Sequence, residues 1–478
     1  MQRNVMLGLL ALMLATAGPA AAATPVDSSA LRDAVTVDGI REHQMALQAA
    51  ADANNGNRAS GSPGYDQSAD YVRSRLRAAG YRVTLQPFSF PTFEELAPTQ
   101  LELVAPLAKA FVGGTDFMTM RYSGSGDVTA PIQAVDLILP PTPEPRSTSG
   151  CEASDFTGFT AGNVALLQRG TCTFAEKVAN AQKAGAAAVL VFNEGQPDRQ
   201  EVIAGSLEES GVDIPALTLS FAVGQELATT KGATVHVVTS TKTEIRKTSN
   251  VLADTTAGRA DHIVVVGAHL DSVPDGPGIN DNGSGVALIL EIAEQLAQLR
   301  VKPANRVRFA FWGAEEVGLQ GSEHYVSKLS EGEIKDIAVN LNFDMVGSPN
   351  FVRFVYDGDG SAGPPAGPSG SAQVEQVFLD YFAQQGLAVE PTGFTGRSDY
   401  RPFIEAGIPA GGLFSGAEGI KTEAQAAVYG GTAGAAYDAC YHQACDTAAN
   451  ANPTALDQLG DAAAHAVLTF AKTTLATE

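Results

Sequence analysis

The sequence predicts an α/β fold: a largely parallel, mixed central sheet flanked by helices, with a smaller α/β domain inserted into it. From Asn250 onward, apolar stretches of strand length alternate with stretches of helical periodicity, a pattern typical of parallel sheets covered by helices. Residues 101–238 differ, because short strands there are separated by many Gly and Pro residues. A chain of 478 residues also exceeds what one hydrophobic core usually holds, so we expect two domains.

The start of the chain has the composition of a targeting segment. Arg3 is followed by an apolar run over residues 5–17 and by small residues over 20–23. This order predicts a signal peptide over residues 1–23. A membrane anchor is the alternative, but the run falls short of the roughly 20 apolar residues that span a bilayer. We therefore expect a secreted protein, extracellular or periplasmic, without a membrane anchor.

Residues 24–100 are expected to form the first part of the larger domain, and their polar start could be a short propeptide. The spacing of apolar residues predicts helices over 37–53 and 65–79, and Gly80 is a typical C-cap for the second helix. Alternation of apolar and polar residues then predicts a strand over 81–90.

The other expected elements fall into the insert and into the rest of the larger domain, residues 239–478. In the insert, over 101–238, the pattern predicts a strand at 164–167, a helix at 174–184 and a strand at 188–192. In the larger domain it predicts strands at 263–266, 307–311, 338–343 and near 408–413, and helices at 285–299 and 372–385.

Charge and cysteine content exclude several classes of partner. The formal net charge of −22 leaves no basic surface for a nucleic-acid backbone or an anionic membrane. The four cysteines of an exported chain favour two local disulfides, Cys151 with Cys172 and Cys440 with Cys445. Zinc binding by these thiolates is the alternative, but neither pair has the C-x2-C spacing of such sites.

Polar side chains that can hold a metal follow three successive strands of the predicted sheet. His269 comes just after the strand at 263–266, Glu315 and Glu316 follow the strand at 307–311, and Asp344 follows the strand at 338–343. Ligand sites of open α/β sheets lie at this carboxyl edge. Adjacent carboxylates are costly there unless a metal or protonation relieves their repulsion.

Two further residues complete a possible ligand set. Asp281 lies in a Gly-rich loop that opens the helix at 285–299, and His442 lies inside the short Cys440–Cys445 loop. Imidazole nitrogens and carboxylate oxygens are ligands that zinc accepts without thiolates. Five such residues give each of two ions three ligands if one carboxylate is shared, which leaves a position for water.

Part of the insert resembles a protease-associated domain. The resemblance rests on residues 163–174, NVALLQRGTCTF, and on Lys177, Ala181, the segment 184–186 and the later Ile214-Pro215. It implies an inserted α/β module without a metal ligand or catalytic base of its own.

The larger domain is similar to the co-catalytic zinc aminopeptidases secreted by bacteria. The similarity rests on GAHLDS at 267–272, GINDNGSG at 278–285, FWGAEEVGLQGS at 311–322 and NFDM at 342–345, and it covers roughly residues 37–475. Those enzymes share a fold with glutamate carboxypeptidase and the transferrin receptor ectodomain. The resemblance therefore implies a monomeric metallo-aminopeptidase with two zinc ions per chain that acts on the N-termini of peptides, with large apolar first residues preferred.

The resemblance also implies a role for each ligand. His269 and Asp344 are expected to hold one zinc ion and Glu316 and His442 the other, with Asp281 bridging the two ions. Five histidines match none of the motifs and are expected to be structural or exposed, namely His43, His236, His262, His324 and His465.

The remaining implied roles concern catalysis. Glu315 is expected to be the general base, Asp271 to orient the imidazole of His269, and Tyr441 and Arg397 to stabilise the oxyanion. For the last three residues a turn cap, simple packing and a surface ion pair remain the alternatives. We expect an apolar substrate pocket to include Phe394, Phe403 and Phe414, although core packing accounts for these residues equally well.

Other functions remain open at this point. The sequence has neither the Gly-x-Ser-x-Gly motif of serine hydrolases nor an H-E-x-x-H helix. Within the same superfamily, a carboxypeptidase or a glutaminyl cyclase would keep much of the ligand set. A non-catalytic, receptor-like ectodomain is the alternative of a different class, and the complete ligand set speaks against it.

Overall fold

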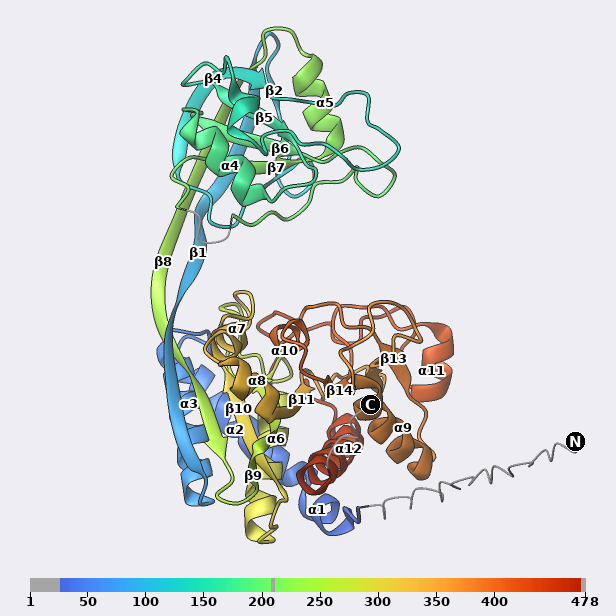
Figure 1. The fold of residues 1–478 in the computed structure, drawn as a ribbon. Helices are drawn as coiled ribbons and strands as arrows, with labels where there is room; N and C mark the ends of the chain where they lie inside the picture. Colours follow the sequence, from blue (N-terminus) through green and yellow to red (C-terminus); the bar gives the residue numbers. More distant parts are fainter. Residues whose placement is uncertain (1–25, 208–210, 474–478) are drawn as a thin grey trace, which may run out of the picture.

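The computed structural model describes residues 26–207 and 211–473, so the predicted signal peptide lies outside the described residues. Among the helices of these residues, none is long and apolar enough to cross a membrane. The larger domain is built on a mixed sheet with the strand order β13-β12-β14-β11-β9-β10-β8-β1 (Figure 1). Its strands are β13 (Glu390–Thr392), β12 (Phe354–Tyr356), β14 (Ala410–Phe414), β11 (Ile337–Phe343), β9 (Arg259–His269), β10 (Asn305–Trp312), β8 (Thr234–Asp254) and β1 (Arg82–Ala105).

The centre of this sheet is parallel and its flanks are antiparallel. β14, β11, β9 and β10 run parallel to one another, whereas β12 pairs antiparallel with β14, and β8 pairs antiparallel with β10. The predicted fold class, a largely parallel mixed sheet flanked by helices, is confirmed. The predicted strand ranges agree with β9, β10, β11 and β14 to within a few residues.

Helices cover both faces of the sheet. Val264 and Val266 of β9 point into the main core, while Ile263 and Val265 point into the core of the opposite face. The main core contains α1 (Ser29–Ala34), α2 (Val37–Asp52), α3 (Pro63–Ala78), α6 (Gly283–Gln298), α9 (Ser371–Gln385) and α12 (Pro453–Lys472). The opposite face is covered by α7 (Gln320–Ser327), α8 (Glu331–Asp336) and α10 (Arg401–Glu405), and α11 (Glu423–Tyr429) lies in the loops after β14.

The helix α6 lies at the centre of the main core and positions the loop that precedes it. Its residues are buried almost all round, as expected for an apolar helix enclosed by others. Asn282 is its N-cap and accepts a hydrogen bond from the backbone N–H of Gly285. A Cβ at Gly285 would lie 2.2 Å from the carbonyl oxygen of Phe343, so only glycine lets the helix approach β11 this closely.

The polar segment near the start of the chain belongs to the core. Leu31 and Val35 are buried in the main hydrophobic cluster. Ser28 hydrogen bonds through its Oγ to Nδ1 of His465 in α12, at 2.8 Å, and Arg32 lies 3.7 Å from Asp461 of the same helix. The residues considered above as a propeptide are therefore integrated into the larger domain.

The insert is a small α/β unit. Its parallel strands β5 (Val164–Gln168) and β6 (Ala188–Phe192) are completely buried between α4 (Phe174–Lys183) and α5 (Phe221–Thr229). The other elements are β2 (Lys109–Ala110), β3 (Phe117–Thr119), β4 (Gly126–Ala134), β7 (Ala216–Leu219) and a short 3-10 helix (Ala153–Phe156). The predicted Cys151–Cys172 disulfide is present.

A long two-stranded ribbon joins the two domains (Figure 1). β1 and β8 pair antiparallel from Arg82 opposite Asp254 to Ala105 opposite Thr234. The strand predicted to end at residue 90 therefore continues past residue 101, because pairing with β8 supports it along its whole length. The same two strands belong to the sheets of both domains.

This pairing predicts that the insert can be removed without loss of the larger domain. Deleting residues 101–238 and joining Gln100 to Thr239 should leave a folded product with unchanged zinc content. The reason is that Gln100 pairs with Val238, so the new ends meet as a β-hairpin, and no candidate ligand is removed. Metal analysis and circular dichroism of the deletion product test this. A folded product without zinc would show that the insert builds the metal site.

Candidate metal centre

The candidate ligands converge at the carboxyl edge of the parallel strands. His269 is the last residue of β9, and it lies opposite Trp312, the last residue of β10. Asp344 directly follows β11, and Glu315 and Glu316 lie in the loop that follows β10. The in-register parallel pairing is therefore what brings together residues that are far apart in the sequence.

Four short distances join the five residues into two groups. Nε2 of His269 lies 3.2 Å from Oδ1 of Asp281 and 3.3 Å from Oδ1 of Asp344. Nε2 of His442 lies 3.1 Å from Oδ2 of Asp281 and 3.0 Å from Oε2 of Glu316. Asp281 belongs to both groups and turns a different carboxylate oxygen to each imidazole.

This arrangement fits a pair of zinc ions. Two donor atoms on one tetrahedral zinc ion, each about 2.0–2.2 Å from it, lie about 3.3 Å apart, which is close to the four distances above. Oε1 of Glu316 is buried and has no hydrogen-bond partner, as expected for an atom that needs a cation. The donors are nitrogen and oxygen only, a set that zinc accepts.

Glu315 lies beside these groups. One of its oxygens, one nitrogen of His269 and one oxygen of Asp344 all lie within 4.8 Å of one another. Burial, together with the charges of Glu316, Asp399 and Asp344, raises the pKa of Glu315 well above its ordinary value despite the nearby imidazole of His269. A carboxyl group with a raised pKa is suited to accept and release a proton.

The electrostatics of the other groups reflect the same crowding of carboxylates. Burial and the charge of Asp281 raise the pKa of Glu316 to about 7. The pKa of Asp281 itself is lowered, because the hydrogen bonds and charges of His269 and His442 outweigh its burial. Burial opposes the charged form of His442, but Asp281 and Glu316 raise its pKa to about 10.

Asp271 lies next to the imidazole of His269. Nδ1 of His269 is 3.2 Å from the backbone oxygen of Asp271 and 3.7 Å from its Oδ1. The same Oδ1 accepts a hydrogen bond from the backbone N–H of Glu315, at 3.2 Å. Asp271 therefore links the strand end that carries His269 to the loop that carries Glu315.

His442 is held by the disulfide-closed loop. The predicted Cys440–Cys445 disulfide is present, and His442 within it has a left-handed backbone with φ of 59°. The ring of Tyr441 stacks on the imidazole, with 3.8 Å between ring centroids. The side chain of His442 is 40% exposed, so this group forms the open side of the centre.

A pocket of about 180 Å³ opens onto these residues. Tyr441 and Arg397 line it, and the guanidinium of Arg397 donates to the hydroxyl of Tyr441 at 3.3 Å and to Glu418 at 2.6 Å. Its more apolar wall consists of Met345, Tyr356, Tyr400, Phe414 and Ala417.

The prediction for the apolar pocket is only partly correct. Phe414 lines the pocket. Phe403 instead packs against Trp312 and Tyr325 on the far face of the sheet, and Phe394 is buried against Tyr356. Core packing accounts for these two rings.

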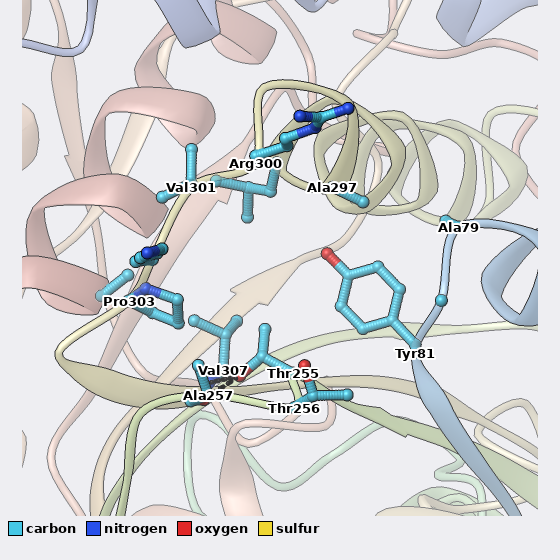
Figure 2. A pocket seen from close by; sticks show the side chains of 14 residues that line it. Ala79, Tyr81, Thr255, Thr256, Ala257, Ala297, Arg300, Val301, Pro303 and Val307 are labelled. Atoms are coloured by element: carbon cyan, nitrogen blue, oxygen red, sulfur yellow. Dashed lines mark hydrogen bonds between the residues drawn. The ribbon is translucent and has the colours of Figure 1, made fainter.

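A second pocket, of about 360 Å³, lies at the opposite edge of the sheet (Figure 2). It is lined by the ring of Tyr81, by Thr255 after β8, by Val307 near the start of β10 and by the loop at 300–303. Among the described residues that line it there is no imidazole or carboxylate, so these residues offer neither a metal ligand nor a base.

The sequence is similar to those of known peptidases. Residues 250–467 match the model of peptidase family M28, and residues 128–227 match that of the PA domain. An aminopeptidase of Pseudomonas aeruginosa is 48% identical over 422 residues, which cover 87% of this chain and 78% of that protein. A probable leucine aminopeptidase 2 of Aspergillus fumigatus is 40% identical, with coverage of 87% and 79%. The chain belongs to peptidase family M28.

Solved structures of aminopeptidases share the fold of this M28 peptidase. The aminopeptidase of Aneurinibacillus sp. strain AM-1 is 26% identical and superposes with a TM-score of 0.71 over 95% of this chain and 98% of its own. A zinc aminopeptidase of Bacillus subtilis is 25% identical, with a TM-score of 0.56 over 91% and 94%. The inserted protease-associated domain expected from the sequence is confirmed by the PA match.

The structure adds residues to the M28 site that the sequence analysis passed over. Oγ of Ser398 donates to Oδ2 of Asp344 at 2.5 Å, and Asp399 is buried beside it. The carboxylate of Asp446 accepts the backbone N–H groups of Asn280 and Asp281, at 2.8 and 2.9 Å. Ser398 and Asp399 lie in the Gly-Arg-Ser-Asp motif from which only Arg397 was selected, and Asp446 directly follows Cys445.

The closed loop of His442 generates a prediction for the M28 peptidase. Replacing both Cys440 and Cys445 by Ala should weaken zinc binding by about 10- to 100-fold, the usual effect of losing support for a ligand. The reason is that the imidazole loses its fixed orientation. Zinc release against a competing chelator measures this affinity.

The other disulfide provides the matched control. Replacing Cys151 and Cys172 by Ala removes a disulfide of the insert, which contains none of the candidate ligands, and should leave zinc affinity unchanged. Equal zinc affinities of the two double variants would show that the Cys440–Cys445 bond has no special role at the metal centre.

Proposed function

We propose that this M28 peptidase is a zinc-dependent aminopeptidase that binds two zinc ions per chain, uses Glu315 as its general base and removes N-terminal residues from peptides. The carboxylate of Asp281 carries the proposal, because its two oxygens face two different imidazoles beside Glu315. The names of the similar proteins from Pseudomonas aeruginosa and Bacillus subtilis support the activity and the metal.

Each residue has a defined task in this proposal. His269 and Asp344 hold one zinc ion, Glu316 and His442 hold the other, and Asp281 bridges them. When bound, the ions supply Lewis acidity, which polarises the scissile carbonyl and makes water acidic enough to be deprotonated near neutral pH. Ser398, Asp446 and Asp271 keep the ligands in place through the hydrogen bonds described above.

Glu315 moves the proton of the reaction. It takes a proton from water as the new C–O bond forms, and it passes that proton to the amine as the C–N bond breaks. Its carboxyl lies near His269 and Asp344, in the pocket. Glu315 therefore has the same protonation state at the end of the reaction as at its start.

Arg397 and Tyr441 stabilise the oxyanion from the pocket wall. The hydroxyl of Tyr441 accepts a hydrogen bond from Arg397, which leaves its own O–H free to donate into the pocket. Arg397 adds positive charge on the same side. The surface ion pair that the sequence left open for Arg397 also exists, with Glu418.

The charge of the pocket favours a free N-terminus over a free C-terminus. Carboxylates of Asp281, Glu315 and Asp344 line the pocket, where an α-ammonium group can sit. A carboxypeptidase needs cations for the substrate carboxylate, and among the described residues that line the pocket the one Arg or Lys is Arg397, which the proposal already assigns to the oxyanion. The apolar wall supports a preference for large first residues such as leucine, as does the name of the Aspergillus fumigatus relative.

Two further aspects belong to the proposal. The protein acts outside the cytoplasm after removal of residues 1–23, and its two disulfides support an oxidising compartment. We also propose that it acts as a monomer, because the nine proposed site residues need no second subunit to complete the site.

Substitutions of Glu315 and Glu316 test separately which residue is the general base and which is a metal ligand. The unmodified protein should contain two zinc ions per chain. Glu315→Gln should keep both and lose about 10²- to 10⁴-fold in kcat, the usual contribution of a general base. Glu316→Gln should lose one zinc ion, because its Oε2 faces His442. Metal analysis and kinetics on leucine anilide test this, and reversed phenotypes would contradict the assignment.

The end from which a peptide is shortened tests the proposed aminopeptidase activity. A peptide with a free N-terminus, a first leucine and an amidated C-terminus should be shortened from its N-terminus. The same peptide with an acetylated N-terminus and a free C-terminus should resist. Mass spectrometry follows both reactions. Shortening from the C-terminus would overturn the aminopeptidase while leaving the metal site intact.

A further inference from the structure

The insert makes a direct contact with the loop that carries the proposed base. Nη2 of Arg121 donates a hydrogen bond to the carbonyl oxygen of Val317, at 3.0 Å. Arg121 belongs to the insert, where its backbone N–H donates to Gly205 and its carbonyl accepts from Leu207. Val317 directly follows Glu315 and Glu316 in the sequence. The guanidinium therefore joins a fixed point of the insert to the edge of the metal centre.

The ribbon supports the same loop from its apolar side. Phe88 and Phe90 of β1 form a small buried cluster with Ala314, and Val317 packs against it. The ring of Phe88 also stacks on His324 of α7, with 5.1 Å between centroids. The two glutamates thus lie between Ala314 and Val317, both of which contact the ribbon.

The loop has a backbone that needs such support. Ala314 and Leu319 have φ of 58° and 61°, in the left-handed region that is unfavourable for a residue with a Cβ. Local hydrogen bonds hold part of it: Ala314 N–H donates to Ser60, and Gly318 and Leu319 N–H both donate to the carbonyl of Glu315. Strained segments persist only where their surroundings hold them in place.

We propose that Arg121 is a positioning residue for the reaction: through Val317 it fixes the loop that presents Glu315 and Glu316, so that the inserted domain sets the rate of hydrolysis. The inference rests on the proposed aminopeptidase function. Arg121 itself does not touch the pocket, and it acts on the base through the peptide group of Val317. Displacement of the base should therefore slow turnover without weakening substrate binding.

Kinetics on leucine anilide with the full chain test the proposal. Arg121→Met, which keeps the side-chain length and removes the donor, should lower kcat by about 3- to 30-fold, less than the ~10²-fold cost of a 1 Å misplacement. KM should stay within about twofold and the zinc content should not change. Arg121→Lys should restore most of kcat, because an ammonium group can donate to the same carbonyl.

Arg199→Met is the matched control. Arg199 lies in the same insert and donates to Glu194 at 2.6 Å, so its loss removes a polar contact of the insert without touching the loop. Its kcat should equal that of the unmodified protein. Equal kcat values for Arg121→Met and Arg199→Met, or a fall in kcat that Arg121→Lys does not restore, would overturn the proposal.

Amide hydrogen exchange tests the contact independently of activity. The N–H groups of Gly318 and Leu319 should exchange faster in Arg121→Met than in Arg199→Met, because the loop has lost its external support. Unchanged exchange at both amides would overturn the proposal. An inactive unmodified protein would instead contradict the proposed function, and the exchange experiment would still decide the role of Arg121.

Discussion

The shared carboxylate of Asp281 is the constraint on which the centre depends. Its side chain is 6% exposed and lies near those of Glu316 and Asp344. Three carboxylates are therefore close together where water has little access. Like charges this close repel unless cations are placed between them. Nε2 of each of two imidazoles faces one of its oxygens, at 3.2 and 3.1 Å, as expected of groups that would share a cation, and the backbone of Asp281 is held by Asp446. The surrounding fold serves to keep this arrangement.

The sheet and α6 each position part of the metal centre. Parallel strands with aligned ends bring His269, Asp344 and the Glu315-Glu316 loop to one edge without any long connection between them. The helix brings Asp281 to the same edge, and the close approach at Gly285 sets its depth. Asp281 directly precedes Asn282, the N-cap of α6, at the positive end of the helix dipole. His442 lies outside the sheet, in a loop that no strand holds. The Cys440–Cys445 disulfide closes this loop instead.

The insert and the larger domain are coupled more closely than a domain boundary implies. β1 and β8 belong to the sheets of both domains, so the insert is attached by two paired strands. Phe88 and Phe90 on this ribbon pack beside the loop of the base, and Arg121 contacts it from the insert. The insert, which contains no candidate metal ligand, thereby contacts the loop that carries the proposed base Glu315.

The sequence by itself determined the fold class, the insert, the two disulfides and the motifs from which nine site residues were predicted. It could do so because each of these depends on local patterns: strand and helix periodicity, cysteine spacing and polar residues at strand ends. Only the tertiary structure decided which residues support the ligands, that Phe403 belongs to the core, and that β1 runs through the expected domain boundary. Ser398, Asp446 and Arg121 act through contacts between segments distant in the sequence, and such contacts leave no periodic signal. Strand pairing and close packing determine them, and both exist only in the folded chain.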